Sequence, residues 1–281
     1  MAEAPLPPPF VAPATAPPAP RIGRPRDVLL LILLGLLLLL SVQFAALSLW
    51  ASLLRESHPG LPFHELLRMA VRKAEYNALF AVLVQTALYV LLAAFIALRV
   101  RRVAAASVLA TLAWRPLPSG HAARLVVGGL GLAIVIQLGT AIFPPPETLP
   151  IDKLISTRLA ALLVLGASLL VAPFFEELIF RGYLYGLLEP AWGTSAAVVV
   201  TGILFGLLHA PQLAPGWVQI GFLCLVGLTF SLIRAKTGSL RASFLMHLAY
   251  NATIAGLFLA GPDFAKLPAA GGTLLWSLFA R

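Results

Sequence analysis

The chain has 281 residues, of which 60% are hydrophobic and only 11% are charged, and its mean hydropathy is +0.93. These values exclude an ordinary soluble globular domain and indicate a polytopic membrane protein. The formal net charge of +9 does not indicate nucleic-acid binding, because the basic residues lie mostly in short segments beside apolar runs. A single cysteine, Cys224, excludes an internal disulfide framework and a cysteine-rich metal cluster.

The first 27 residues are rich in proline and alanine and have no helical or strand period. We expect 1–27 to be a disordered tail. The apolar run that follows, 28–50, is long enough to cross a bilayer and too long for the core of a signal peptide. The sequence therefore predicts a first transmembrane helix here.

Further apolar runs predict an all-α bundle of about seven to eight transmembrane helices. We expect 28–143 to hold N-terminal helices and 144–281 to form the functional core. A weaker run, 267–279, is interrupted by two glycines and is the doubtful eighth helix. The remaining runs are 78–98, 125–143, 159–188, 191–208, 217–233 and 242–260.

Arginine and lysine in the short loops predict the orientation in the membrane. Three basic segments fall on one side if every run crosses once, whereas the loop 144–158 balances to zero charge. We therefore expect the amino terminus to be cytoplasmic, in the inner membrane of a bacterium. The basic residues on that side are Arg21, Arg24, Arg26, Arg99, Arg101, Arg102, Arg115, Arg124, Arg234, Lys236 and Arg241.

Few ionisable side chains lie inside the apolar runs. Glu176 and Glu177 are the only two of eleven acidic residues there, and His209 and His247 the only two of five histidines. Ionisable groups at membrane depth cost a few kcal/mol and usually face a cavity or pair with one another. These four residues are the first candidates for a functional site.

Helical spacing separates the two glutamates. Glu177 and Arg181 are four residues apart, so they share a helix face and can form an ion pair. Such a pair can be purely structural. Glu176 is turned about 100° from Glu177 and is free to act as a base.

Each of the two histidines has another candidate residue four positions away on the same helix face. His247 precedes Asn251, and Phe205 precedes His209. The turn predicted at 189–193 lies about 25 Å along the helix from both Glu176 and His209, so the two meet at one depth in an antiparallel pair. A carboxylate and an imidazole there can activate a water molecule, and the groups at 247 and 251 can bind an oxyanion.

Simple helical rise places His247 about 15 Å shallower than His209 if both turns lie at the membrane surface. Three explanations stay open at this stage. The turn at 189–193 extends beyond the membrane, the helix bends near Pro173, or the expected helix ends are wrong by a turn or two.

Three motifs in order, EELIFR, FGLLH and HLAYN, resemble those of the CAAX protease and bacteriocin-processing (CPBP) family of intramembrane proteases, which includes the type II CAAX prenyl proteases. The resemblance covers about 159–260. It implies that Glu176 is the catalytic glutamate, assisted by His209, and that His247 and Asn251 stabilise the oxyanion. The second glutamate and the arginine of the first motif would support it.

The family is classed with metalloproteases, although the role of a metal in it is unsettled. His209, His247 and Glu176 could make a three-ligand zinc site with an open position for water. The sequence has no HExxH helix, and metal-free activation by the glutamate stays equally open. The resemblance implies substrates near the carboxyl end of prenylated or membrane-bound polypeptides, with the lipid bilayer as a partner.

Two other classes of function stay open. A proton-coupled transporter also uses intramembrane glutamate and histidine, but the sequence shows no inverted repeat and no matching pair of broken helices. A non-catalytic member of the family, acting as a membrane scaffold or a bacteriocin immunity protein, is the stronger alternative. The intact motifs favour an endopeptidase over both.

Overall fold

The computed structural model describes residues 22–24, 26–104, 106–145 and 148–269. In these ranges the chain is all-α, and the predicted fold class, a polytopic helical bundle, is confirmed. Most of the tail 1–27 and most of the weak run 267–279 lie outside the described residues. The fold class therefore rests on the helices between them.

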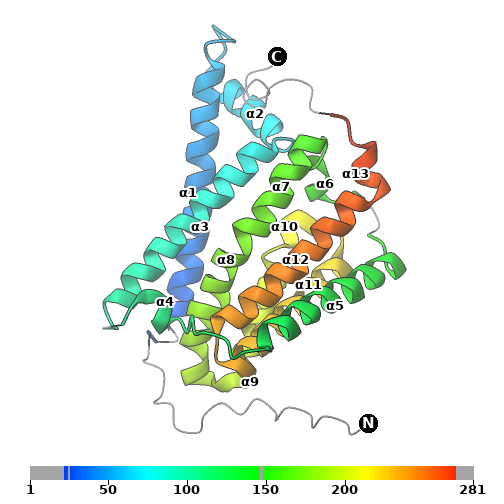
Figure 1. The fold of residues 1–281 in the computed structure, drawn as a ribbon. Helices are drawn as coiled ribbons and strands as arrows, with labels where there is room; N and C mark the ends of the chain where they lie inside the picture. Colours follow the sequence, from blue (N-terminus) through cyan, green and yellow to red (C-terminus); the bar gives the residue numbers. More distant parts are fainter. Residues whose placement is uncertain (1–21, 25, 105, 146–147, 270–281) are drawn as a thin grey trace, which may run out of the picture.

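Figure 1 shows the helices of the described ranges. They are α1 (Arg26–Leu54), α2 (Phe63–Ala74), α3 (Ala78–Arg101), α4 (Val108–Thr111), α5 (His121–Ile142), α6 (Pro150–Leu154), α7 (Arg158–Leu170), α8 (Ala172–Glu177), the π-helix η1 (Leu178–Leu184), α9 (Tyr185–Leu207), α10 (Ala210–Leu213), α11 (Trp217–Thr237), α12 (Leu240–Ala260) and α13 (Pro262–Lys266). Of these, α7, α8, η1 and the first part of α9 follow one another as one continuous arm.

Six stretches of the described residues are long and apolar enough to cross a membrane. One of them, Arg158–Leu213, has 56 residues and turns at Gly193, where φ is 81° and ψ is 165°. Glycine adopts this left-handed φ without the clash that a Cβ brings. If the two arms of this stretch are counted separately, the six stretches become seven. This number agrees with the seven transmembrane helices expected from sequence before the weak run 267–279.

Two segments of the described chain lie outside the predicted transmembrane helices. The amphipathic helix α2, whose Leu66 and Ala70 are buried against α1, has no counterpart among the predicted elements. The stretch 106–123, which lies between two of the predicted runs, folds partly under the bundle. Ala113 is buried there and its carbonyl accepts from the Leu240 amide at 2.8 Å. Periodicity alone does not show such a backbone contact.

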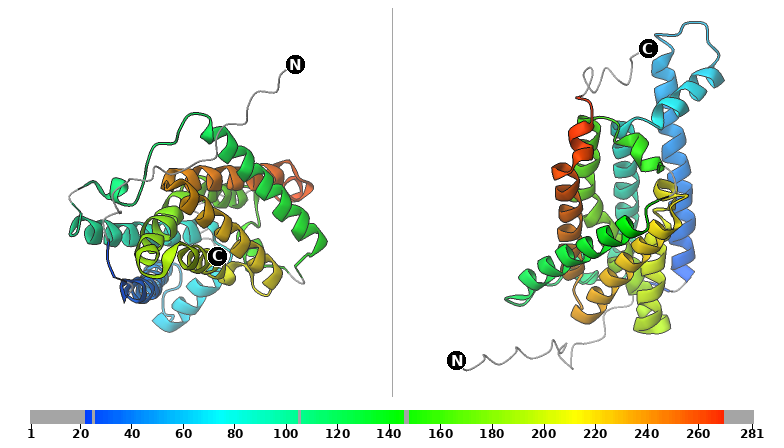
Figure 2. Two further views of the ribbon diagram at one scale, coloured as in Figure 1. Left: turned by 90° about the horizontal axis from the view of Figure 1, so that it is seen from below. Right: turned by 90° about the vertical axis from the view of Figure 1, so that its right-hand side faces the viewer.

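Glycines allow α9 and α11 to approach closely. A Cβ on Gly202 would lie 2.6 Å from the Leu228 amide nitrogen, and one on Gly129 of α5 would lie 2.5 Å from the Met246 carbonyl of α12. Backbone contacts of this kind replace side-chain packing where lipid supplies no hydrophobic drive between helices. One helix of each pair, α9 and α12, carries a motif, and Figure 2 shows two further views of the bundle that these helices help to form.

The outer surface is apolar where the bundle meets lipid. Leu29, Leu37 and Leu40 on α1 are 61–68% exposed, and no large stretch of a soluble protein presents so many exposed leucines. The chain is therefore an integral membrane protein.

The close approach of α9 and α11 predicts the effect of a single methyl group. Gly202→Ala should lower the free energy of unfolding by about 1–3 kcal/mol, because the added Cβ overpacks against the α11 backbone. Gly221→Ala, on α11 with open space around its Cβ position, is the control and should be neutral or stabilising by up to about 1 kcal/mol. Thermal unfolding of both variants in detergent measures the difference; equal effects would contradict it.

Candidate active site

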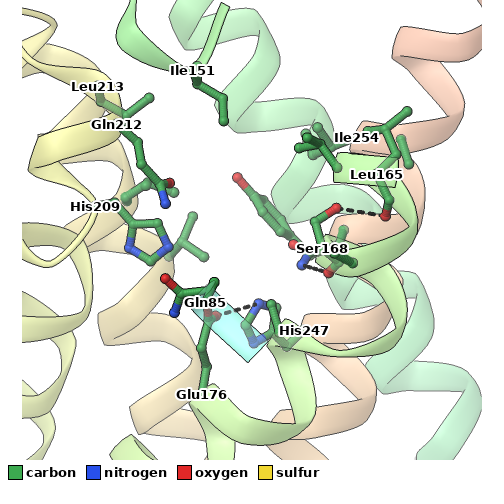
Figure 3. Close-up of a pocket in the computed structure, with 18 of the residues that line it drawn as sticks. Gln85, Ile151, Leu165, Ser168, Glu176, His209, Gln212, Leu213, His247 and Ile254 are labelled. Carbon is green, nitrogen blue, oxygen red and sulfur yellow. Dashed lines mark hydrogen bonds and ion pairs between the residues drawn. The ribbon is translucent and has the colours of Figure 1, made fainter. Parts of the chain in front are cut away.

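A cavity of about 530 Å³ lies between α3, α5, α7, α8, α9, α10, α11 and α12 (Figure 3). Four of the six predicted site residues line it, namely Glu176, His209, His247 and Asn251. The other two, Glu177 and Arg181, lie behind its wall and are fully buried. The structure thus brings all three motifs to one place and separates them into a lining set and a supporting set.

Glu176 reaches the cavity from the end of α8. This short helix begins at Ala172 after the end of α7, with Pro173 in its first turn. The Glu176 side chain is held from two sides. The Tyr89 hydroxyl of α3 donates to its Oε1 at 2.5 Å, and the other oxygen, Oε2, lies 3.7 Å from Nε2 of His247. The carboxylate is therefore fixed in direction and only 8% exposed.

The predicted ion pair between Glu177 and Arg181 forms, with Nη1 donating to Oε1 at 3.0 Å. The arginine also donates from Nη2 to the Gly227 carbonyl at 2.7 Å and from Nε to the Ser231 hydroxyl at 3.2 Å. Its guanidinium lies 4.5 Å from the centre of the Phe205 ring. Every face of this cation is occupied, so it holds the helices together and does not reach the cavity.

His247 lies between the two glutamates. Its Nδ1 is 3.0 Å from Oε1 of Glu177, and its ring stacks on Phe230 at 4.6 Å. The Glu177 carboxylate, ionised beside Arg181, can only accept, so Nδ1 carries a hydrogen. This bond fixes the tautomer and turns Nε2 toward Glu176.

His209 lies between the end of α9 and the start of α10. Figure 3 shows its ring at the cavity, on the side of α10. Its Nδ1 lies 2.8 Å from the Phe205 carbonyl oxygen. Because a carbonyl only accepts, this nitrogen carries the hydrogen, and Nε2 of the neutral ring keeps a lone pair for a donor such as water.

The expected depth difference of about 15 Å between His209 and His247 is wrong. The Phe205 ring centre lies 5.7 Å from that of His247 and 4.9 Å from that of His209, so the two histidine rings lie less than about 11 Å apart. Among the three explanations, the structure favours the first. The α11–α12 turn lies where the sequence places it, between Thr237 and Leu240, and the turn at Gly193 extends farther out than that turn (Figure 1).

Asn251 lies one turn beyond His247 on α12. Its Nδ2 donates to the Ser168 carbonyl of α7 at 2.8 Å. A carboxamide has two N–H groups, so the second hydrogen and the oxygen of this side chain stay available to a bound ligand.

The donor set does not form a preorganised metal site. Among the described residues no group of three or more His, Cys, Asp and Glu side chains is arranged to hold a metal ion. Both nitrogens of His247 face glutamates, and Nδ1 of His209 is bound to a backbone carbonyl. Hydrogen bonds at Nδ1 leave Nε2 of both rings as the nitrogen that a metal would use. The zinc site of Glu176, His209 and His247 therefore stays a prediction, and we derive no step through a metal.

Sequence reasoning missed Tyr89, which lies 87 residues before Glu176. The signal was present, because Gln85, Thr86 and Tyr89 are polar residues in an otherwise apolar run, and Gln85 and Tyr89 are four apart on one face. Gln85 also lines the cavity. Helix α3 therefore contributes to the site although it lies outside the three motifs.

The supporting pair predicts a contrast between two adjacent glutamates. Glu177→Gln leaves Arg181 without its buried counter-charge and should cost about 3–5 kcal/mol of stability. Glu176→Gln keeps an acceptor for the Tyr89 hydroxyl and should unfold at a temperature close to that of the wild type. Detergent-resistance and thermal unfolding of both variants test this, and a reversed order would refute the assignment of roles.

Residues 158–253 match the family model described as type II CAAX prenyl endopeptidase Rce1-like. The match runs from α7 into α12 and contains all six predicted site residues, while Tyr89 lies outside it. Comparison with curated proteins found no match, and comparison with solved structures found none either. The chain is an integral membrane protein whose segment 158–253 is similar to the Rce1-like family of type II CAAX prenyl endopeptidases.

Proposed function

We propose that this protein is an intramembrane endopeptidase, which hydrolyses a peptide bond of a membrane-associated or lipid-modified polypeptide with water activated by Glu176. The observation that carries the proposal is the position of this carboxylate. It is the only acidic side chain among the lining residues described, it is held by Tyr89 and faced by His247, and His209 lines the same cavity.

In the proposed reaction, water binds between the Glu176 carboxylate and Nε2 of His209. The carboxylate takes one proton as the water oxygen attacks the carbonyl carbon of the substrate. The resulting oxyanion accepts from the Asn251 amide and, when the imidazole is protonated, from Nε2 of His247. The carbon–nitrogen bond then breaks, and the carboxylic acid at position 176 returns its proton to the leaving amine.

The supporting residues act before the reaction. Glu177 fixes the His247 ring, and the hydroxyl of Tyr89 holds the carboxylate at position 176 in place, so that neither reorganises during attack. The apolar wall keeps bulk water from the reacting groups. Hydrolysis within a bilayer needs both polar groups that hold one water molecule and an apolar wall that excludes the rest.

The proposal predicts new peptide ends in membranes that contain the protein. Mass spectrometry of cells with the wild type should find ends that are missing with Glu176→Gln at matched abundance. Glu189→Gln, at the far end of the same helical arm, is the control and should keep them. Identical sets of ends in all three under several growth conditions would favour a non-catalytic scaffold or immunity protein.

A second prediction concerns Tyr89. Replacement by Phe removes one hydrogen bond to a charged group, worth about 1.5–3 kcal/mol, and should lower kcat/KM by about 10- to 100-fold. The protein should stay folded, because the ring and its stacking on Phe175 at 5.5 Å are kept. Cleavage rates of a substrate found by the first experiment measure the effect. An unchanged cleavage rate would contradict a role of Tyr89 in the reaction.

We also propose the orientation expected from sequence, with the end of the bundle that holds Arg26 in the cytoplasm of a bacterium. The described residues place ten lysines and arginines at this end and seven at the other. The cavity extends the other way, toward α6 and α10.

This orientation has a direct test. An enzyme reporter active only in the cytoplasm should work when joined after Lys236, in the last turn of α11, and fail when joined after Arg158. A reporter active only outside the cytoplasm should give the opposite result. The reverse pattern would invert the protein and place the cavity mouth in the cytoplasm.

A further inference from the structure

We infer that Arg115 and Arg234 form a binding site for a phosphate anion, at the end of the bundle that holds Arg26. The headgroup of an anionic phospholipid or a soluble phosphate can supply this anion, since both present the same oxygens. The site lies apart from the cavity, whose described lining contains neither arginine. It is independent of the proposed function, because binding there needs no cleavage.

Arg234 is a buried cation without an ion pair. It lies in the last turn of α11 and is only 9% exposed. Its guanidinium lies 5.0 Å from the centre of the Tyr185 ring, and its Nε is enclosed without a hydrogen-bond partner in the described part of the chain. A buried charge that lacks a partner of opposite sign is costly. A bound anion would offset this cost.

The carboxylates at this end of the bundle are bound to other groups. Glu189 acts on the buried arginine only as a more distant charge. Its Oε1 accepts from the Tyr185 hydroxyl at 2.7 Å and from the Thr194 hydroxyl at 3.3 Å. The other described acid at this end, Asp27, pairs with Arg99 at 3.1 Å. The positive charge at position 234 is therefore left for a ligand.

The fold holds a second cation, Arg115, near the first. The Ser239 hydroxyl, in the α11–α12 turn, donates to the Arg115 carbonyl at 2.8 Å and so fixes the segment to this turn. Nη1 of Arg115 lies 3.7 Å from the position that a Cβ on Gly238 would take. Gly238 follows Arg234 by one helical turn, and the two like charges act on each other. An anion between them would remove this repulsion.

Phosphate matches this pair of side chains. A guanidinium is planar and presents parallel N–H groups that fit phosphate oxygens. Arg234 is held against the Tyr185 ring with its Nε enclosed, which leaves its two terminal nitrogens for a ligand. Arg115 is exposed and is free to turn toward the same ligand. The two free oxygens of a phosphodiester can therefore accept from one arginine each.

The level of the site suits a lipid headgroup. The turn at 189–193 lies at the same end of the bundle (Figure 1) and exposes 54% of Trp192. Tryptophan favours the interface between headgroups and acyl chains. Other lysines and arginines occupy this end as well, and basic residues at the membrane surface attract anionic lipids. The two arginines therefore lie where phospholipid phosphates are concentrated.

The test is thermal unfolding of the purified full-length protein in a neutral detergent at constant ionic strength, alone and with phosphatidylglycerol, phosphatidylcholine or inorganic phosphate. We expect phosphatidylglycerol to raise the unfolding temperature by about 2–4 °C more than phosphatidylcholine does, because a ligand that binds the folded state stabilises it. A rise with inorganic phosphate instead would assign the site to a soluble phosphate. Equal effects of the two lipids without an effect of phosphate, or no effect of any of the three, would overturn the inference.

Three variants separate this site from the general positive charge at the same end. Arg115→Gln should weaken phosphatidylglycerol binding by about tenfold, read from the lipid concentration that gives half of the temperature shift. Arg102→Gln, which removes an exposed arginine at the end of α3, is the control and should leave that concentration unchanged. Arg234→Gln should abolish the shift. If it does not fold, the exposed position 115 still decides, since equal binding by Arg115→Gln and the wild type would overturn the inference.

Discussion

The buried contact between Glu177 and Arg181 is the interaction on which the rest of the site depends. It joins η1 to α11 through the Gly227 carbonyl and the Ser231 hydroxyl, and to α12 through His247. A buried ion pair adds little net stability, but breaking one partner is costly. Its effect here is directional, because it fixes the His247 ring that faces Glu176 and so sets the geometry of the cavity floor.

The sequence predicted this centre because membrane helices make polar residues conspicuous. The four-residue spacing of Glu177 and Arg181 is confirmed as an ion pair, and the turn at 189–193 is confirmed at Gly193. The expected depth of His247 was wrong, because the calculation placed the turn at 189–193 level with the α11–α12 turn, whereas the structure has it farther out. Tyr89 was missed because its partner is 87 residues away. The division into 28–143 and 144–281 stays a prediction, although α3 and α5 contribute to the cavity wall.

The cavity combines one carboxylate, two imidazoles and several carboxamides with apolar walls. Its polar groups suit activation of water, and its described lining holds no lysine or arginine. These are separate properties, since the first concerns the reaction at position 176 and the second concerns which polypeptides enter. The family match supports protease chemistry in general, whereas the choice of substrate rests on the wall of this chain.

The most direct test of the central role of Glu176 is a single-turnover cleavage in heavy-oxygen water, with protein in excess over a substrate identified from its membranes. If the carboxylate activates water for direct attack, the new carboxyl terminus carries one heavy oxygen atom after the first turnover. A first-turnover product without heavy oxygen would contradict the account, because its oxygen would then have come from a side chain of the protein.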